Sequence, residues 1–271
     1  MRDNSEPVLQ VERLRFRYPG GPLVLEDVTW SMAADEVVGI VGPSGAGKST
    51  LLWHLNGLLP DPTPTGRDGA LPMVRVAGRP VHREHLAEIR RRVGLVFQDP
   101  DDQLFCPTVR EDVAFGPLNL GLGNGEVEQR ITESLGAVGL EGFERRSTLG
   151  LSLGEKKRVC LAGVLACQPD VLVLDEPSSN LDPRARRGLL EILKGYPGSQ
   201  VIATHDLDLV AEHCRRVLVL DAGRLHADGP PQAVLADECL MHEHGLEVPL
   251  SLKLRALQCG AEGVARLPGI T

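Results

Sequence analysis

The sequence predicts an α/β fold built around a parallel sheet, and three observations lead to this prediction. A glycine-rich turn at residues 42–50 lies between a strand-like apolar stretch and a helical pattern. A later apolar stretch ends in two carboxylates, Asp175 and Glu176. Further strand-like stretches at 200–204 and 217–220 alternate with helical patterns. This alternation is the βαβ rhythm of a parallel sheet.

The glycine-rich turn fits the phosphate-binding pattern G-x-x-x-x-G-K-[ST] without a mismatch. Its glycines let backbone N–H groups point at phosphate oxygens, and the helix that follows adds the positive end of its dipole. We predict that Lys48 reaches the β- and γ-phosphates of a nucleoside triphosphate, and that the Ser49 hydroxyl is a ligand of Mg²⁺. The predicted nucleotide-binding residues of the turn are Gly42, Pro43, Ser44, Gly45, Ala46, Gly47, Lys48, Ser49 and Thr50.

The two carboxylates follow the apolar stretch 171–174, which is typical of a buried parallel strand. Ligand sites in open α/β sheets lie at the carboxyl ends of the strands, so this strand is expected to carry both acids to such a site. We predict that Asp175 holds the Mg²⁺ shell and that Glu176 orients or deprotonates an attacking water. The alternative is an ordinary solvated strand end.

The remaining segments add a small antiparallel sheet and a helical insert to the α/β core. The expected elements are antiparallel strands within 8–38 around a turn at 19–22, a loop at 60–72, a strand or hairpin at 73–81, a core strand at 93–97, and a mostly helical stretch at about 107–165. We predict one domain over residues 1–235, with a helical subdomain at about 100–165, followed by a C-terminal tail at 236–271.

Composition restricts the classes of partner. The net charge of -8 and the pI near 5.5 argue against a general affinity for nucleic acid. The longest wholly apolar run, 159–167, is far shorter than the ~20 residues that a membrane helix requires. Residues 1–7 are polar and charged, so no signal peptide is expected before Val8.

Cysteine and histidine spacing gives no predicted transition-metal site. The six cysteines form no C-x-x-C pair, and we expect reduced thiols in a cytoplasmic protein. His242, Glu243 and His244 suggest metal capture at first sight. Residues two apart on a helix do not face each other, however, and the sequence offers no evident third ligand.

The segment 151–158, Leu-Ser-Leu-Gly-Glu-Lys-Lys-Arg, stands ahead of the paired acids and resembles the LSGGQ signature of ABC transporter ATPases. In that family the signature faces the γ-phosphate of ATP on the opposite subunit. The resemblance implies that Ser152 and Gly154 bind nucleotide in trans, at a helix N-terminus. Leu153 and Glu155 depart from the consensus.

Other positions match the same family. Gln98 resembles the Q-loop glutamine, which implies a catalytic role and contact with Mg²⁺. His205 resembles the switch histidine, which implies a bond to the γ-phosphate and orientation of Glu176. Asp182 lies in a D-loop-like segment and is also suited to cap the next helix. Tyr18 resembles the aromatic residue that stacks on adenine. The implied fold is a P-loop NTPase of the ABC nucleotide-binding type.

A narrower resemblance covers most of the chain. Segments 96–105 and 107–117 are similar to the ATPase component of energy-coupling-factor importers, particularly those for cobalt and nickel ions. Segments 54–59 and 245–252 are similar to the same branch. The resemblance implies that Gln103 helps to dock a membrane scaffold.

These features together predict a Mg-dependent ATPase at the cytoplasmic face of the membrane, with ATP and Mg²⁺ bound. Expected partners are a second copy of this chain or a paralogous ATPase, an integral membrane scaffold and substrate-binding subunits, but no nucleic acid. Two alternatives remain: an importer for a vitamin or another small solute, and a soluble ABC ATPase without a transport role. A module that no longer hydrolyses ATP is disfavoured by the presence of Glu176 and His205.

Overall fold

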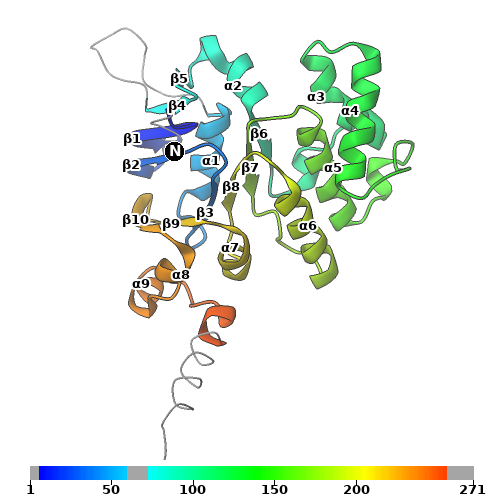
Figure 1. Cartoon of the computed structure of the whole chain (residues 1–271). Coiled ribbons are helices and arrows are strands. Elements are labelled where there is room, and N and C mark those ends of the chain that lie inside the picture. Colours follow the sequence, from blue (N-terminus) through cyan, green and yellow to red (C-terminus); the bar gives the residue numbers. More distant parts are fainter. Residues whose placement is uncertain (1–5, 60–72, 255–271) are drawn as a thin grey trace, which may run out of the picture.

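The protein is represented by a computed structural model that describes residues 6–59 and 73–254. Within these ranges the strands form one six-stranded sheet and one four-stranded sheet, and the helices surround them (Figure 1). The loop expected at 60–72 lies outside the described residues. None of the described helices is long and apolar enough to cross a membrane.

The six-stranded sheet has the order β10-β9-β3-β8-β7-β6, and all its neighbouring strands are parallel except β10, which runs antiparallel to β9. The predicted parallel sheet is therefore confirmed. The sequence did not predict β10, because its residues alternate between exposed and half-buried positions and include no continuous apolar run. The strands are β3 (Val37–Val41), β6 (Val93–Val96), β7 (Val171–Asp175), β8 (Ser199–Ala203), β9 (Arg216–Asp221) and β10 (Arg224–Gly229).

The four-stranded sheet is antiparallel, with the order β2-β1-β4-β5. The predicted N-terminal hairpin and the strand pair near residue 75 are thus confirmed. Leu9 and Val11 are buried with the period of two that a strand requires, and Leu14 is buried after a register shift between Val11 and Leu14. The strands are β1 (Leu9–Arg17), β2 (Leu23–Met32), β4 (Val74–Val76) and β5 (Arg79–Pro80).

Three helices, α3, α4 and α5, form a lobe beside β6 and β7, here called the helical lobe (Figure 1). It occupies the stretch where the sequence predicted a helical insert. The helices are α1 (Lys48–Asn56), α2 (Leu86–Arg92), α3 (Val109–Asn119), α4 (Asn124–Ala137), α5 (Leu153–Leu165), α6 (Pro183–Gly195), α7 (Leu207–His213), α8 (Pro231–Val234) and α9 (Glu238–Glu243).

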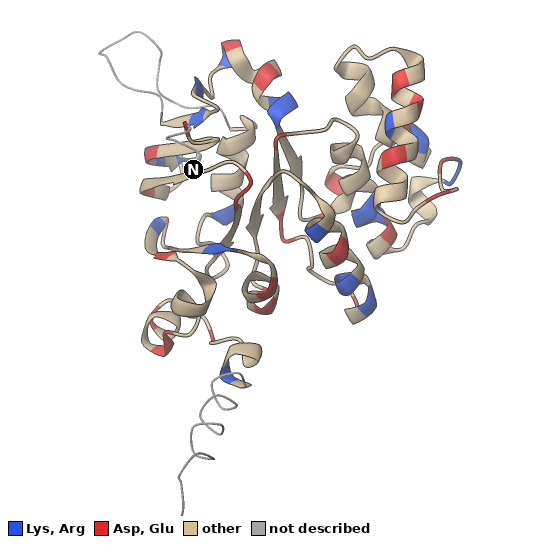
Figure 2. Cartoon of the chain, viewed as in Figure 1, with Lys and Arg blue, Asp and Glu red and all other residues tan. Residues whose placement is uncertain are grey.

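Strand β7 is buried on both faces and separates two hydrophobic clusters. Leu172 and Leu174 belong to the cluster shared with the helical lobe, whereas Val171 and Val173 belong to the cluster shared with the small sheet and α1. A strand covered on both sides cannot alternate in polarity, which explains its continuous apolar sequence. Strands β3, β6 and β8 carry no charged residue, and Figure 2 shows charges of both signs on the helices around the sheet.

The segment after α8 packs onto the main core as far as it is described. Met241 and Leu252 are buried in the same cluster as the helical lobe. The domain boundary at 235 and 236 stays a prediction, and the last part of the expected tail, 255–271, lies outside the described residues.

Candidate active site

The phosphate loop joins β3 to α1 and has room only for glycine at two of its positions. A Cβ atom added to Gly42 would lie 1.8 Å from the carbonyl oxygen of Leu220. Gly47 has φ +101°, and an added Cβ would lie 3.0 Å from the carbonyl oxygen of Val24. Both positions therefore require glycine, as the motif predicts.

The N-terminus of α1 is arranged for an anion. Gly47 at the N-cap supplies no side-chain hydrogen bond, and the first turn holds no acidic residue. Backbone N–H groups at such an end have no intrahelical acceptor and carry the positive end of the helix dipole. Lys48 Nζ lies beside them and donates to the carbonyl oxygens of Gly42 and Pro43, at 2.7 and 3.0 Å. Burial lowers the pKa of Lys48, and the nearby carboxylates of Glu176 and Asp175 act in the opposite direction.

The predicted Mg²⁺ residues meet at one cavity at the carboxyl edge of the sheet. Ser49, Gln98 and Asp175 all line this cavity, whose volume is about 440 Å³. Asp175 is 3% exposed, and burial raises its pKa while a hydrogen bond with Ser49 lowers it. Its Oδ1 atom has no hydrogen-bond partner among the described residues. A buried carboxylate oxygen without a partner, next to a hydroxyl, is the type of donor set that Mg²⁺ prefers, so these residues fit the ion.

Glu176 is held tightly at the same edge. Its Oε2 atom lies 2.7 Å from Nδ1 of His205 and accepts hydrogen bonds from the backbone N–H of His205 and the hydroxyl of Thr204, both at 3.2 Å. The Glu176 backbone has φ +47°, a left-handed conformation that costs a non-glycine residue energy. Its N–H donates to the carbonyl of Ala203 at 2.8 Å, which keeps the strained residue in place.

Lys157 of α5 holds the segment that follows β7, and this role was not predicted from the sequence. Its side chain is buried, and Nζ donates to the carbonyl oxygens of Glu176 and Pro177 and to the hydroxyl of Ser179. Burial lowers the pKa of Lys157, while the Glu176 carboxylate raises it. Lys157 therefore ties the helical lobe to the segment after β7. The only available signal was its place in the basic run 156–158, and the run alone does not show which lysine is buried.

The signature-like residues lie apart from this cluster, at the N-terminus of α5. Ser152 is the exposed N-cap residue of α5, and Glu155 completes a capping box with it. Glu155 Oε2 accepts hydrogen bonds from the N–H and the hydroxyl of Ser152, both at 2.8 Å. The bonds from the backbone and the side chain of Ser152 lower the pKa of Glu155. Gly154 lies on the same turn, near Leu181 and the start of α6.

Two further predicted residues adjoin the nucleotide region. The Tyr18 hydroxyl lies 3.2 Å from that of Thr50, the third residue of α1, so Tyr18 is attached to the phosphate-loop helix. Stacking on adenine stays a prediction. Asp182 caps α6 by accepting from the backbone N–H groups of Arg184 and Ala185, so its capping role is confirmed.

Gln103 has a structural task that differs from the expected docking role. Its Oε1 atom accepts from the backbone N–H of Phe97 at 3.1 Å, and its Nε2 atom donates to the carbonyl of Cys160 at 3.2 Å. Both ends of the amide thus join the end of β6 to α5, and the docking role expected for Gln103 stays a prediction.

A larger cavity, of about 910 Å³, lies at the opposite edge of the sheet, between α4, the end of α5 and α6. Its lining includes Asp35, Asp170 and Ser199, which are at or before the amino ends of strands. Nucleotide sites of α/β sheets lie at the carboxyl ends. The smaller cavity lies at the carboxyl ends of the strands and is therefore the better candidate for the active site.

Comparison with known proteins identifies the family. The model of the ABC transporter family matches residues 25–179, more than half of the chain. The chain belongs to this ABC transporter family. A protein of Gloeobacter violaceus that is named as an ABC transporter ATP-binding protein is 50% identical over 249 residues. The match covers 91% of this chain and 98% of that protein. An energy-coupling factor transporter ATP-binding protein of Methanocaldococcus jannaschii, EcfA, is 45% identical and covers 89% of this chain and 86% of its own length.

Solved structures agree with this assignment. CbiO1 of Clostridium perfringens, described as part of the ABC transporter complex CbiONQ, is 34% identical with a TM-score of 0.74, and the match covers 92% of this chain and 99% of that chain. The ATP-binding cassette MJ0796, a dimer bound to ADP and phosphate, is 25% identical with a TM-score of 0.72, covering 82% and 98%.

The predicted resemblance and the predicted fold are therefore confirmed. The chain is an ABC ATPase coupled to transport, with the P-loop α/β fold and the antiparallel subdomain of that family. The structure brings Lys48, Ser49, Asp175, Glu176 and His205 to one edge of the sheet. Ser152 and Gly154 lie on the helical lobe instead.

Proposed function

We propose that this chain hydrolyses Mg-ATP as one of two ATPase subunits of an energy-coupling-factor importer for cobalt or nickel ions. The observation that carries the ATPase part is the meeting of Ser49, Gln98 and Asp175 at one cavity, with the Glu176–His205 pair at the same sheet edge. The import part is supported by relatives named EcfA and by the likeness to CbiO1 of a CbiONQ complex.

Each residue of the edge has a task in hydrolysis. Lys48 and the N–H groups of α1 bind the β- and γ-phosphates, while Ser49, Gln98 and Asp175 hold Mg²⁺. Mg²⁺ in this position neutralises phosphate charge. Glu176 accepts the proton of the attacking water, and His205 orients that carboxylate through the 2.7 Å contact. Lys157 keeps the Glu176 backbone in its strained conformation.

The active site is completed across a dimer. Ser152 lies on the helical lobe and is exposed, so its hydroxyl and the N-terminus of α5 are available to the γ-phosphate of a second ATPase subunit. The known dimer of a related cassette supports this arrangement. The second subunit is another copy of this chain or a paralogue.

The membrane scaffold docks on an exposed apolar surface formed by Phe105, in the segment before α3, and by Phe115 and Leu118 of α3. These side chains are 65%, 49% and 52% exposed, and the two rings pack edge to face at 4.7 Å. Exposed aromatic clusters of this kind favour protein partners. The acidic residues nearby are a less suitable test, because Asp101 forms an ion pair with Lys156 of α5 at 2.6 Å.

Replacing Glu176 by Gln tests the assigned chemistry. The variant is expected to bind ATP with unchanged affinity but to hydrolyse it about 10²- to 10⁴-fold more slowly, because it lacks the carboxylate base. Turnover equal to that of the wild type would contradict the role of Glu176.

Substrate and docking are tested with the complex co-purified from membranes and reconstituted in vesicles. ATP-dependent uptake of Co²⁺ or Ni²⁺ is expected, whereas uptake of a vitamin alone would reassign the substrate. Phe115→Ser is expected to weaken co-purification of the membrane subunits, and Leu250→Ser, at an exposed apolar residue outside the helical lobe, is the control. Full retention of the membrane subunits by Phe115→Ser would place docking elsewhere.

A further inference from the structure

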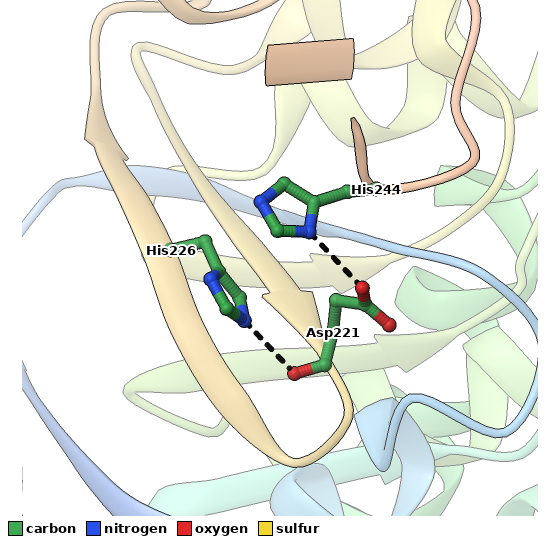
Figure 3. Close-up of side chains that lie close together, drawn as sticks. All are labelled: Asp221, His226 and His244. Atoms are coloured by element: carbon green, nitrogen blue, oxygen red, sulfur yellow. Dashed lines mark hydrogen bonds and ion pairs between the residues drawn. The ribbon is translucent and has the colours of Figure 1, made fainter. Parts of the chain in front are cut away.

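A cluster of side chains that could ligate a metal lies outside the Mg²⁺ residues, where the C-terminal segment meets the β9–β10 hairpin. It consists of Asp221 at the end of β9, His226 in β10 and His244 directly after α9 (Figure 3). The three possible ligand atoms lie within 4.8 Å of one another. The ABC ATPase reaction uses none of these residues.

The contacts within the cluster show that it is built rather than accidental. Nδ1 of His244 lies 3.0 Å from Oδ2 of Asp221, and Nε2 of His226 lies 3.2 Å from the carbonyl oxygen of Asp221. The two imidazole rings lie side by side (Figure 3), with 4.1 Å between their centroids and a tilt of 40° between their planes. His244 is 7% exposed, so its ring is fixed, whereas His226 is exposed and its ring can turn.

The backbone of the hairpin explains why His226 points to this place. The strand register shifts between Leu225 and Ala227, so His226 is the extra residue of a β-bulge. Bulges redirect the side chain of the extra residue. The turn before it, Ala222-Gly223, has positive φ at both residues and is the two-residue type that holds hairpins in register.

We propose that Asp221, His226 and His244 bind a divalent transition-metal ion such as Zn²⁺, which clamps the end of α9 to the β9–β10 hairpin. Two imidazoles and one carboxylate suit Zn²⁺, Co²⁺ or Ni²⁺ and are a poor set for Mg²⁺ or Ca²⁺, which prefer oxygen. With metal–ligand bonds of about 2.0–2.2 Å, tetrahedral ligands lie roughly 3.3–3.5 Å apart. The His244–Asp221 pair is already near this spacing, and a turn of the exposed His226 ring brings in the third donor.

The clamp connects to the phosphate loop through the hairpin turn. The N–H of Gly223 donates to the carbonyl of Ala46 in the phosphate loop at 3.2 Å, and the N–H of Glu26 donates to the carbonyl of Gly223 at 2.8 Å. A bound ion therefore orders a segment in direct contact with the nucleotide-binding loop. This inference concerns the isolated chain and goes beyond the transport proposal, so either proposal can fail without the other.

Titration of the full chain with ZnCl₂, after dialysis against EDTA and without nucleotide, tests the site by calorimetry. The wild type is expected to bind one equivalent of Zn²⁺, and His226→Asn is expected to weaken this binding by roughly tenfold or more. His226 is suitable because it is exposed, so its replacement leaves the fold intact. His242→Asn is the matched control, since His242 is an exposed histidine two residues from His244.

Two further measurements exclude other causes. Cys239 is an exposed thiol on α9, and Cys239→Ser is expected to retain Zn²⁺ binding if the site uses nitrogen and oxygen. Hydrogen exchange at residues 221–226 and 240–246 is expected to slow on addition of Zn²⁺ in the wild type but not in His226→Asn. Equal Zn²⁺ affinity in the wild type and His226→Asn, or a loss of binding in His242→Asn or Cys239→Ser as large as in His226→Asn, would overturn the proposal.

Discussion

Helices α1 and α5 are both assigned to the binding of phosphate at their N-termini, yet the two ends are prepared in opposite ways. The first turn of α1 has a glycine N-cap, no capping side chain and no acid, and Lys48 stands beside it. The first turn of α5 is closed by the capping box of Ser152 and Glu155, which places a carboxylate where phosphate is expected. The N-terminus of α1 can accept an anion directly, whereas the Glu155 carboxylate already occupies the N-terminus of α5.

The difference has a physical consequence for the order of events. ATP binding to the phosphate loop needs no rearrangement of α1, since its N–H groups have no competing acceptor. Docking of a second subunit's γ-phosphate on α5 requires the Ser152 hydroxyl to turn away from Glu155 and the phosphate to lie near a carboxylate. The structure of the single chain therefore favours nucleotide binding first and dimer closure second. The following predictions test this contrast.

The largest effect is expected from Lys48→Ala, which removes the positively charged side chain at the N-terminus of α1. Hydrolysis should fall by about 10²- to 10³-fold, comparable to the loss of a donor that stabilises developing charge. Steady-state ATPase assays and ATP binding to the purified chain measure this effect. Lys194→Ala is the control, because Lys194 pairs only with the surface acids Glu191 and Glu212 in the described structure. Unchanged ATP binding and turnover in Lys48→Ala would show that the N-terminus of α1 is not part of the nucleotide site.

Ser152→Ala is expected to have a smaller effect that separates binding from hydrolysis. ATP binding to the single chain should persist, while hydrolysis falls by at least about tenfold, since the variant lacks a donor to the partner's γ-phosphate. The lost cap also costs about 1 kcal/mol of stability.

A second capping box in the chain provides the matched control for Ser152. Thr108 and Glu111 close α3 in the same way. Thr108→Ala should lose similar stability, measured by urea denaturation, but retain full ATPase activity. If both variants lose activity equally, the effect of Ser152 is structural.

Glu155→Gln is expected to have a modest effect in the opposite direction. Gln keeps the capping geometry but removes the charge that opposes phosphate. The ATP-dependent dimer, trapped with Glu176→Gln and followed by light scattering, should tighten by about two- to fivefold. Glu111→Gln on α3 should change nothing. A weaker dimer in Glu155→Gln would show that the carboxylate helps closure rather than opposing it.

The smallest effect is the pH dependence of the α5 cap. The Ser152 bonds lower the pKa of Glu155 in the folded chain below its ordinary value of 4.5, so the cap adds stability above pH 4.5 and loses it as the pH falls through the folded-state value. Because the side chain is 24% exposed and solvent screens its charge, this contribution is about 0.5 kcal/mol or less. The difference in unfolding free energy between wild type and Glu155→Gln should therefore shrink between pH 7 and pH 3. A constant difference would exclude the proposed cause.

The sequence by itself determined those parts of the protein that depend on neighbours along the chain. The phosphate loop with Lys48 and Ser49, and the strand that ends at Asp175, are local patterns of backbone conformation and polarity, and the structure shows them where they were expected. The parallel sheet also followed from local periodicity. Among the described strands, β10 was not predicted, because an edge strand with exposed residues has no distinctive hydrophobic pattern.

Only the tertiary structure decided which distant residues meet, because folding brings them together through sheet order and packing. The family resemblance implied that His205 orients Glu176, and the structure supplies the physical cause of their contact, since β7 and β8 are parallel neighbours. Lys157 is buried while the adjacent Lys156 binds Asp101, a difference that depends on which face of α5 meets the core. The cluster of Asp221, His226 and His244 depends on a bulge and on the packing of α9, neither of which has a local signal in the sequence.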